Sequence, residues 1–156
     1  MPQDLTGLSE SFMVEVDYSE VAQEISRMST DDRRRFNRRF QLRHKKGRRV
    51  LTCAWIPPGL VSERVTNKQL LDFVRDRGLI QPDLAVSRIA LRGDLPGPAA
   101  AAVCGIPLTT ALAETIWVIH RHHGGLINRV CVQMQADWIT ETWFLVVISD
   151  ERIRQV

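Results

Sequence analysis

The chain has 156 residues, of which 44% are hydrophobic and 25% charged, with a formal net charge of +3. These values are typical of a globular protein, and the length predicts a single globular domain over residues 1–156. The three cysteines are odd in number and widely spaced, which excludes a disulfide framework and a CxxC metal knuckle.

The free cysteines indicate a reducing compartment, cytoplasmic or nuclear. The N-terminal residues lack a positive segment followed by an apolar one, so we expect no secretory signal. The longest run of aliphatic and aromatic residues, 143–148, is far shorter than the about 20 residues that a membrane span needs. We therefore expect neither secretion nor a transmembrane segment.

The charge is segregated along the chain. Residues 1–32 hold eight acids and one arginine, residues 33–49 hold ten bases and no acid, and residues 50–156 hold ten of each. All the excess positive charge therefore lies in one block, which says more about binding partners than the overall isoelectric point does.

Two elements are expected before the basic block. Residues 12–17 alternate between apolar and polar side chains, which predicts a half-buried strand. Residues 21–28 place apolar side chains at helical spacing, and Ser19 is a candidate N-cap. A second helix is predicted to start at Thr30, in front of two aspartates that favour a helix N-terminus.

The basic block itself is predicted to be a helix followed by a hairpin, over residues 30–56. Residues 39–43 alternate like a strand, residues 44–47 form a Gly-containing turn, and residues 50–56 form the return strand. The turn would be basic except for its glycine.

The rest of the chain predicts a mixture of both element types. We expect a helix capped by Thr66 and ended by Gly78, a short strand within residues 84–92, and a helix that starts at Thr109 or Thr110. The alanine-rich residues 99–107 fit either a turn of helix or a packed connector. The last two strands, around residues 129–135 and 143–148, are expected to form an antiparallel hairpin, the second of them central in the sheet.

The predicted fold class is α+β, a single domain with a mostly antiparallel twisted sheet and three to four helices on one of its faces.

The basic block is the candidate functional site. Clustered bases bind nucleic-acid phosphates because each contact releases a condensed counterion, and arginine adds bidentate hydrogen bonding. The interleaved aromatic residues offer stacking surface. The sequence therefore predicts a small intracellular RNA- or DNA-binding protein without catalysis that contacts the phosphate backbone through Arg33, Arg34, Arg35, Arg38, Arg39, Arg43, Lys45, Lys46, Arg48 and Arg49.

Other interpretations of this block stay open. The acidic residues 1–32 could neutralise it in space, leaving a solvated surface. Alternatively, the protein is a self-associating scaffold, of the viral matrix or accessory type, that binds an anionic membrane or an acidic protein. Trp117 and Trp138 are the candidates for a homo-oligomer contact, since exposed tryptophan is enriched in interfaces.

A metal site and an active site are the less favoured hypotheses. His120 and His123 would share one side of the predicted helix, and with Cys131 they could supply part of a zinc site, although a wet helix end explains the histidines equally well. No P-loop, GxGxxG, HExxH or GxSxG motif occurs, so an enzyme would need an active site dispersed along the chain. No cofactor is expected.

Overall fold

The computed structural model describes residues 2–40, 46–122 and 125–153. These residues form four helices and seven strands, which confirms the predicted α+β class. In chain order they are β1 (Phe12–Asp17), α1 (Tyr18–Ser26), α2 (Thr30–Arg39), β2 (Arg48–Ile56), α3 (Asn67–Asp76), α4 (Leu84–Arg92), β3 (Ala99–Val103), β4 (Leu108–Thr109), β5 (Glu114–Arg121), β6 (Ile127–Gln133) and β7 (Thr142–Arg152).

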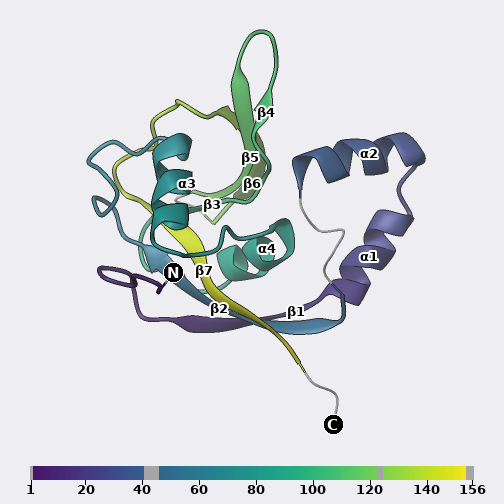
Figure 1. The fold of residues 1–156 in the computed structure, drawn as a ribbon, viewed down its shortest axis with the longest axis horizontal. Coiled ribbons are helices and arrows are strands. Elements are labelled where there is room, and N and C mark those ends of the chain that lie inside the picture. Colours follow the sequence, from purple (N-terminus) through teal and green to yellow (C-terminus); the bar gives the residue numbers. More distant parts are fainter. Residues whose placement is uncertain (1, 41–45, 123–124, 154–156) are drawn as a thin grey trace.

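All the strands belong to one mixed sheet. β1, β2, β7, β3 and β5 lie side by side in that order, and both β4 and β6 pair with β5 (Figure 1). Within the described sheet only β3 and β7 run parallel, and every other pair is antiparallel. The sheet is therefore mostly antiparallel, as predicted.

Helices cover both faces of this sheet, whereas the sequence predicted helices on one face. Alternation along β2 explains the two layers: Cys53 and Trp55 pack in one core, and Ala54 and Ile56 pack in the other. The first core contains residues of α4 and contacts from α1 and α2, and the second contains residues of α3. A strand buried on both faces needs a helix on each, which is why one-sided coverage was wrong.

Three elements form as the sequence predicted. β1 alternates buried and exposed residues, and β7 lies between β2 and β3 as a central strand. Helix α3 begins with a capping box, in which the Thr66 hydroxyl accepts from the backbone of Gln69 while the Gln69 side chain accepts from the backbone N–H of Thr66. Gly78 follows α3 with a φ of 68°, the left-handed conformation in which glycine costs least.

Two predicted N-caps are displaced by a short distance. Asp17, rather than Ser19, caps α1 by accepting from the backbone N–H of Ser19. Ser29, rather than Thr30, caps α2 by accepting from the backbone N–H of Asp32. In both cases a suitable side chain lies just before the predicted one.

Two predictions of element type were wrong. Residues 84–92 form helix α4, not a strand, because Asp83 caps the helix through a hydrogen bond from the Val86 N–H to its carboxylate. Residues 114–121 form strand β5, not a helix, because the segment pairs along most of its length with β6 and in part with β3. Leu112, which lies within the expected helix, is almost fully exposed in the turn before β5.

The alanine-rich segment and the last strands also differ from expectation. Ala99–Val103 is strand β3, fully buried between β7 and β5. β6 pairs with β5, and β7 pairs with β2 and β3, so the two last strands do not form the expected hairpin. Residues 134–141 carry the chain from one part of the sheet to another instead of turning it back on itself.

Candidate nucleic-acid interface

Helix α2 carries most of the described part of the basic block. Ser29 caps its first turn, Asp31 and Asp32 occupy that turn, and Arg38 and Arg39 occupy its last turn. Acids near the N-terminus and bases near the C-terminus both complement the helix dipole. A segment with five arginines is therefore stable as a helix because its few acids lie at one end.

Two phenylalanines attach α2 to the protein. Phe36 packs against the first core and Phe40 is only 3% exposed. Their ring centroids lie 5.0 Å apart, as expected for residues four apart on one side of a helix. The backbone carbonyl of Arg39 also accepts a hydrogen bond, at 2.8 Å, from the N–H of Ile106. These contacts determine which side of α2 faces solvent.

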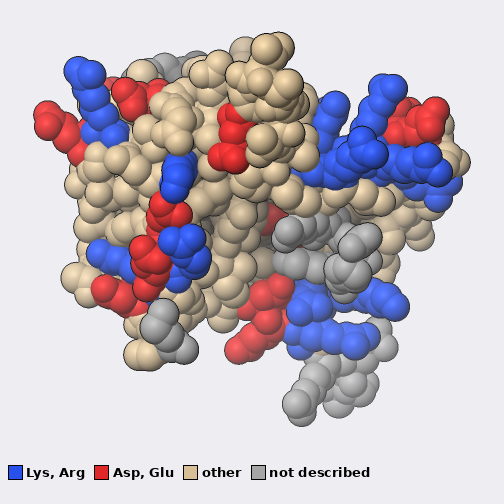
Figure 2. Space-filling view, turned by 45° about the horizontal axis from the view of Figure 1, so that its top comes forward, with Lys and Arg blue, Asp and Glu red and all other residues tan. Residues whose placement is uncertain are grey.

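The solvent side of α2 is an arginine face. Among the described residues, no carboxylate lies within the 4.0 Å of an ion pair with any of its guanidinium groups. Figure 2 shows this concentration of Lys and Arg side chains over the part of the surface that α2 forms, with acids at its outer end. The arginine face consists of four exposed residues, Arg33, Arg34, Arg35 and Arg38.

The rest of the predicted block is divided. Arg48 forms an ion pair with Glu15, and Arg49 forms a half-buried one with Asp150 at 2.7 Å. Lys46 is exposed. Arg43 and Lys45 lie outside the described residues. Of the predicted residues that the structure describes, five on α2 have no carboxylate partner among the described residues, and two at the start of β2 are paired.

The predicted basic hairpin falls mostly outside the described residues, because its first strand was expected at residues 39–43 and its turn at residues 44–47. Of the described part, Arg39 is the last residue of α2. The return strand forms as β2, which pairs with β1 along one edge and with β7 along the other. The hairpin itself stays a prediction.

The acidic N-terminal residues leave the arginine face unneutralised by direct contact. Glu15 pairs with Arg48, while Asp4 and Glu24 pair with Arg77 and Arg88, which lie outside the block. Asp17 caps α1, and Asp31 and Asp32 lie in the first turn of α2 itself. Among the described residues, these acids therefore form no direct ion pair with the arginines of α2.

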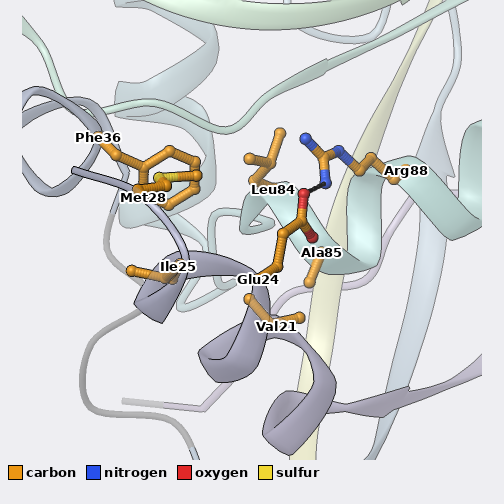
Figure 3. Close-up of a pocket in the computed structure, with 8 residues that line it drawn as sticks. All are labelled: Val21, Glu24, Ile25, Met28, Phe36, Leu84, Ala85 and Arg88. Atoms are coloured by element: carbon orange, nitrogen blue, oxygen red, sulfur yellow. Dashed lines mark ion pairs between the residues drawn. The ribbon is translucent and has the colours of Figure 1, made fainter. Parts of the chain in front are cut away.

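Helices α1 and α2 form an arm that follows β1 and whose first residue is bonded beside the start of β2. The N–H of Tyr18, the first residue of α1, donates to the carbonyl of Gly47 at 2.8 Å. The arm contacts α4 around a small pocket of about 20 Å³, where the Glu24 carboxylate lies 3.6 Å from Arg88 (Figure 3). The lining is otherwise apolar and comprises Val21, Ile25, Met28, Phe36, Leu84 and Ala85.

A cation–aromatic cluster adjoins the C-terminal end of α2. The guanidinium carbon of Arg39 lies 4.9 Å from the ring centroid of Trp117 on β5, and that of Arg129 on β6 lies 5.7 Å from it. We call these three residues the Trp117 cluster. Sequence reasoning included Arg39 and named Trp117 only as a contact for self-association. It missed Arg129, although the alternation of residues 130–134 already placed Arg129 on the wet face.

The helix on which the zinc hypothesis depended does not form. His120 lies on strand β5 instead of a helix, Cys131 lies on β6 opposite Trp117, and His123 lies outside the described residues. No cluster of three or more His, Cys, Asp or Glu side chains suited to a metal ion occurs among the residues that the structure describes. His120 instead packs against His122 and Trp138, with centroid distances of 3.8 and 5.3 Å. Burial, and then the neighbouring His122, lower the pKa of His120 to about 4.

One tryptophan is buried and the other three, Trp117, Trp138 and Trp143, are half-buried. Trp55 is buried, Trp143 packs against the first core, and Trp138 donates a hydrogen bond to Asn67 while its ring contacts Phe144. Self-association stays a prediction.

Within the described part of the chain, every helix is too short or too polar to cross a membrane.

Comparisons with known proteins return no match: no family model, no curated protein and no solved structure is similar to this chain. The arginine face and the Trp117 cluster are therefore the features from which a function can be inferred.

Proposed function

We propose that this protein binds nucleic acid, RNA or DNA, by placing the arginine face of α2 against the phosphate backbone. The observation that carries the proposal is the contrast within the basic block. Arg48 and Arg49 have carboxylate partners, whereas Arg33, Arg34, Arg35 and Arg38 are exposed without one among the described residues. Unpaired guanidinium groups keep their full capacity for phosphate oxygens.

A folded frame supports this role better than a tail would. Phe36 and Phe40 hold α2 against the core, so its arginines project from a helix of fixed orientation. Less side-chain and backbone freedom is then lost on binding. Because phosphate contacts carry no base information, we expect weak sequence preference and a steep dependence on salt. That the protein lacks catalytic activity stays a prediction.

The test is a salt series on a charge-reversed variant. Arg34, Arg35 and Arg38 are changed together to Glu, and the affinity for a duplex and for a single strand is measured by fluorescence anisotropy between 50 and about 300 mM salt. A plot of log K against log salt has a negative slope. Each lost phosphate contact makes this slope less steep, by roughly 0.9 for a duplex and 0.7 for a single strand. The variant should therefore bind much more weakly, with a slope smaller by about 2 to 3.

The chain offers a matched control with the same change of charge. Arg64, Lys68 and Arg75 are exposed bases on and before α3, on the other face of the sheet. Changing these three to Glu should leave affinity and slope close to those of the wild type. If the wild-type protein binds no nucleic acid at 50 mM salt, or if both variants lose the same affinity, the proposal is wrong. Binding of the wild type to anionic vesicles alone would assign the face to a membrane instead.

A further inference from the structure

The Trp117 cluster extends the arginine face onto the sheet. Arg39 is the last residue of α2, and its guanidinium group lies over a ring that belongs to β5. Arg129 reaches the same ring from the edge strand β6. Neither arginine has a carboxylate partner among the described residues, and Arg129 is exposed. The cluster therefore joins two cations to a half-buried aromatic ring at the end of an unpaired basic helix.

These groups match the two parts of a nucleotide. Guanidinium groups bind phosphate oxygens, and indole rings and guanidinium planes both provide flat surfaces on which a base can stack. The ring also restrains both arginines through cation–π contacts, which lowers the entropy that they lose when an anion binds. An arginine held over a ring without an acid partner remains available to an external anion.

We propose that the protein binds single-stranded nucleic acid in preference to duplex, with one nucleotide seated at the Trp117 cluster and the neighbouring phosphates on the arginine face of α2. This inference rests on the proposed function and adds the class of substrate to it. The base of that nucleotide stacks on the cluster, and Arg39 and Arg129 contact its phosphates.

The preference for single strands follows from access to the bases. In a duplex the face of each base is covered by its neighbours, so a side chain reaches it only after unstacking, which costs a few kcal/mol. A single strand presents its bases without that cost. The arginine face alone would bind both forms, since phosphates are present in both. The Trp117 cluster is therefore the feature that discriminates between them.

Substitutions at Trp117 test the stacking. Trp117→Leu retains an apolar side chain beside Gly105 but removes the aromatic plane, and Trp117→Phe restores a smaller plane. Stacking of one base contributes enough that Trp117→Leu should weaken single-strand binding roughly 5- to 150-fold. Duplex binding should change less than about twofold, and Trp117→Phe should recover part of the loss. Trp138→Leu is the matched control, because Trp138 packs against the opposite core.

Cys131 provides a second measurement at the same place. It is the strand partner of Trp117 and it is exposed, whereas Cys53 and Cys104 are buried. Burial raises the pKa of Cys53 and of Cys104 to about 12, so these two thiols are poor nucleophiles near neutral pH. A maleimide should therefore modify Cys131 alone in the native protein. A saturating single strand should slow this reaction severalfold, and an equal length of duplex should not.

The outcomes separate the inference from the proposed function. If the wild type binds neither form, the proposed function fails. If it binds both forms equally and Trp117→Leu changes neither, the arginine face stands and the inference is wrong. The inference is also overturned if Trp117→Leu loses equal affinity for single strand and duplex while the single strand does not change the rate at which maleimide modifies Cys131. The ring would then only support α2. Selective loss on the single strand, with recovery in Trp117→Phe, supports it.

Discussion

Removing the hydroxyl of Tyr18 should destabilise the protein and loosen the arm that carries the arginine face. Tyr18 is 1% exposed, and its hydroxyl donates to Oδ2 of Asp83 at 2.5 Å. The other oxygen of Asp83 caps α4 by accepting from the N–H of Val86 at 2.9 Å. One carboxylate thus links the first residue of α1 to the start of α4.

The size of the effect follows from what Tyr18→Phe removes. Phenylalanine keeps the buried ring, and the loss includes the hydrogen bond to the Asp83 carboxylate, which is worth about 1.5–3 kcal/mol. For a domain of this length that corresponds to a fall in Tm of about 3–12 °C. Urea unfolding followed by circular dichroism should give this difference with an unchanged slope.

A second variant isolates the pair. Asp83→Ser retains a residue that can cap α4 but is too short to reach Tyr18. In that background Tyr18→Phe should lower the free energy of unfolding by less than it does in the wild type, since the Asp83 carboxylate is already gone. The reasoning is refuted if Tyr18→Phe lowers the free energy of unfolding equally in both backgrounds, or does not lower it in the wild type. The hydrogen bond to Asp83 would then not stabilise the attachment of the arm.

The same contact has a pH signature. Burial, and then Asp83, raise the pKa of Tyr18 well above its ordinary value of 10.0. The folded state thus holds the proton that the unfolded state releases near pH 10, so this contribution is complete below pH 10 and declines above it. The stability difference between wild type and Tyr18→Phe should therefore shrink as the pH rises beyond 10.

Two further predictions concern the sheet. Because His120 has a pKa of about 4 when folded and 6.5 when unfolded, stability should fall by at most about 3 kcal/mol as the pH drops from 6.5 to 4. His120→Gln should flatten that part of the profile, and an unchanged slope would exclude His120 as the source. A Cβ at Gly105 would lie 2.9 Å from the backbone nitrogen of Trp117, so Gly105→Ala should cost about 1–3 kcal/mol. Gly93→Ala, where the nearest atom is 3.5 Å away, is the control; equal stability of both variants would refute the steric argument.

The elements that sequence reasoning located correctly carry their signals within a few neighbouring residues. α3 has Thr66 and Gly78 at its ends and an apolar stripe between them, and β1 alternates along its whole length. Phe36 and Phe40 lie four residues apart in the sequence, and both attach α2 to the core. Such periodicities depend on backbone geometry alone.

The errors came from segments whose form depends on distant partners. Residues 114–121 have both apolar and β-branched side chains, and their strand conformation results from pairing with β6 and β3. Likewise, β2 pairs with β1 and β7, two segments that lie outside the basic block. Short apolar segments are ambiguous between helix and strand until their neighbours in space are known.

The sequence by itself determined that this protein concentrates its positive charge in residues 33–49. Tertiary structure decided which of those charges stay unpaired, because Glu15 and Asp150 reach Arg48 and Arg49 only through strand pairing. It also brought Arg129 and Trp117 to the end of α2, from segments at least 78 residues further along the chain than Arg39. Composition fixes the amount of charge, whereas proximity between distant residues depends on how the whole chain packs.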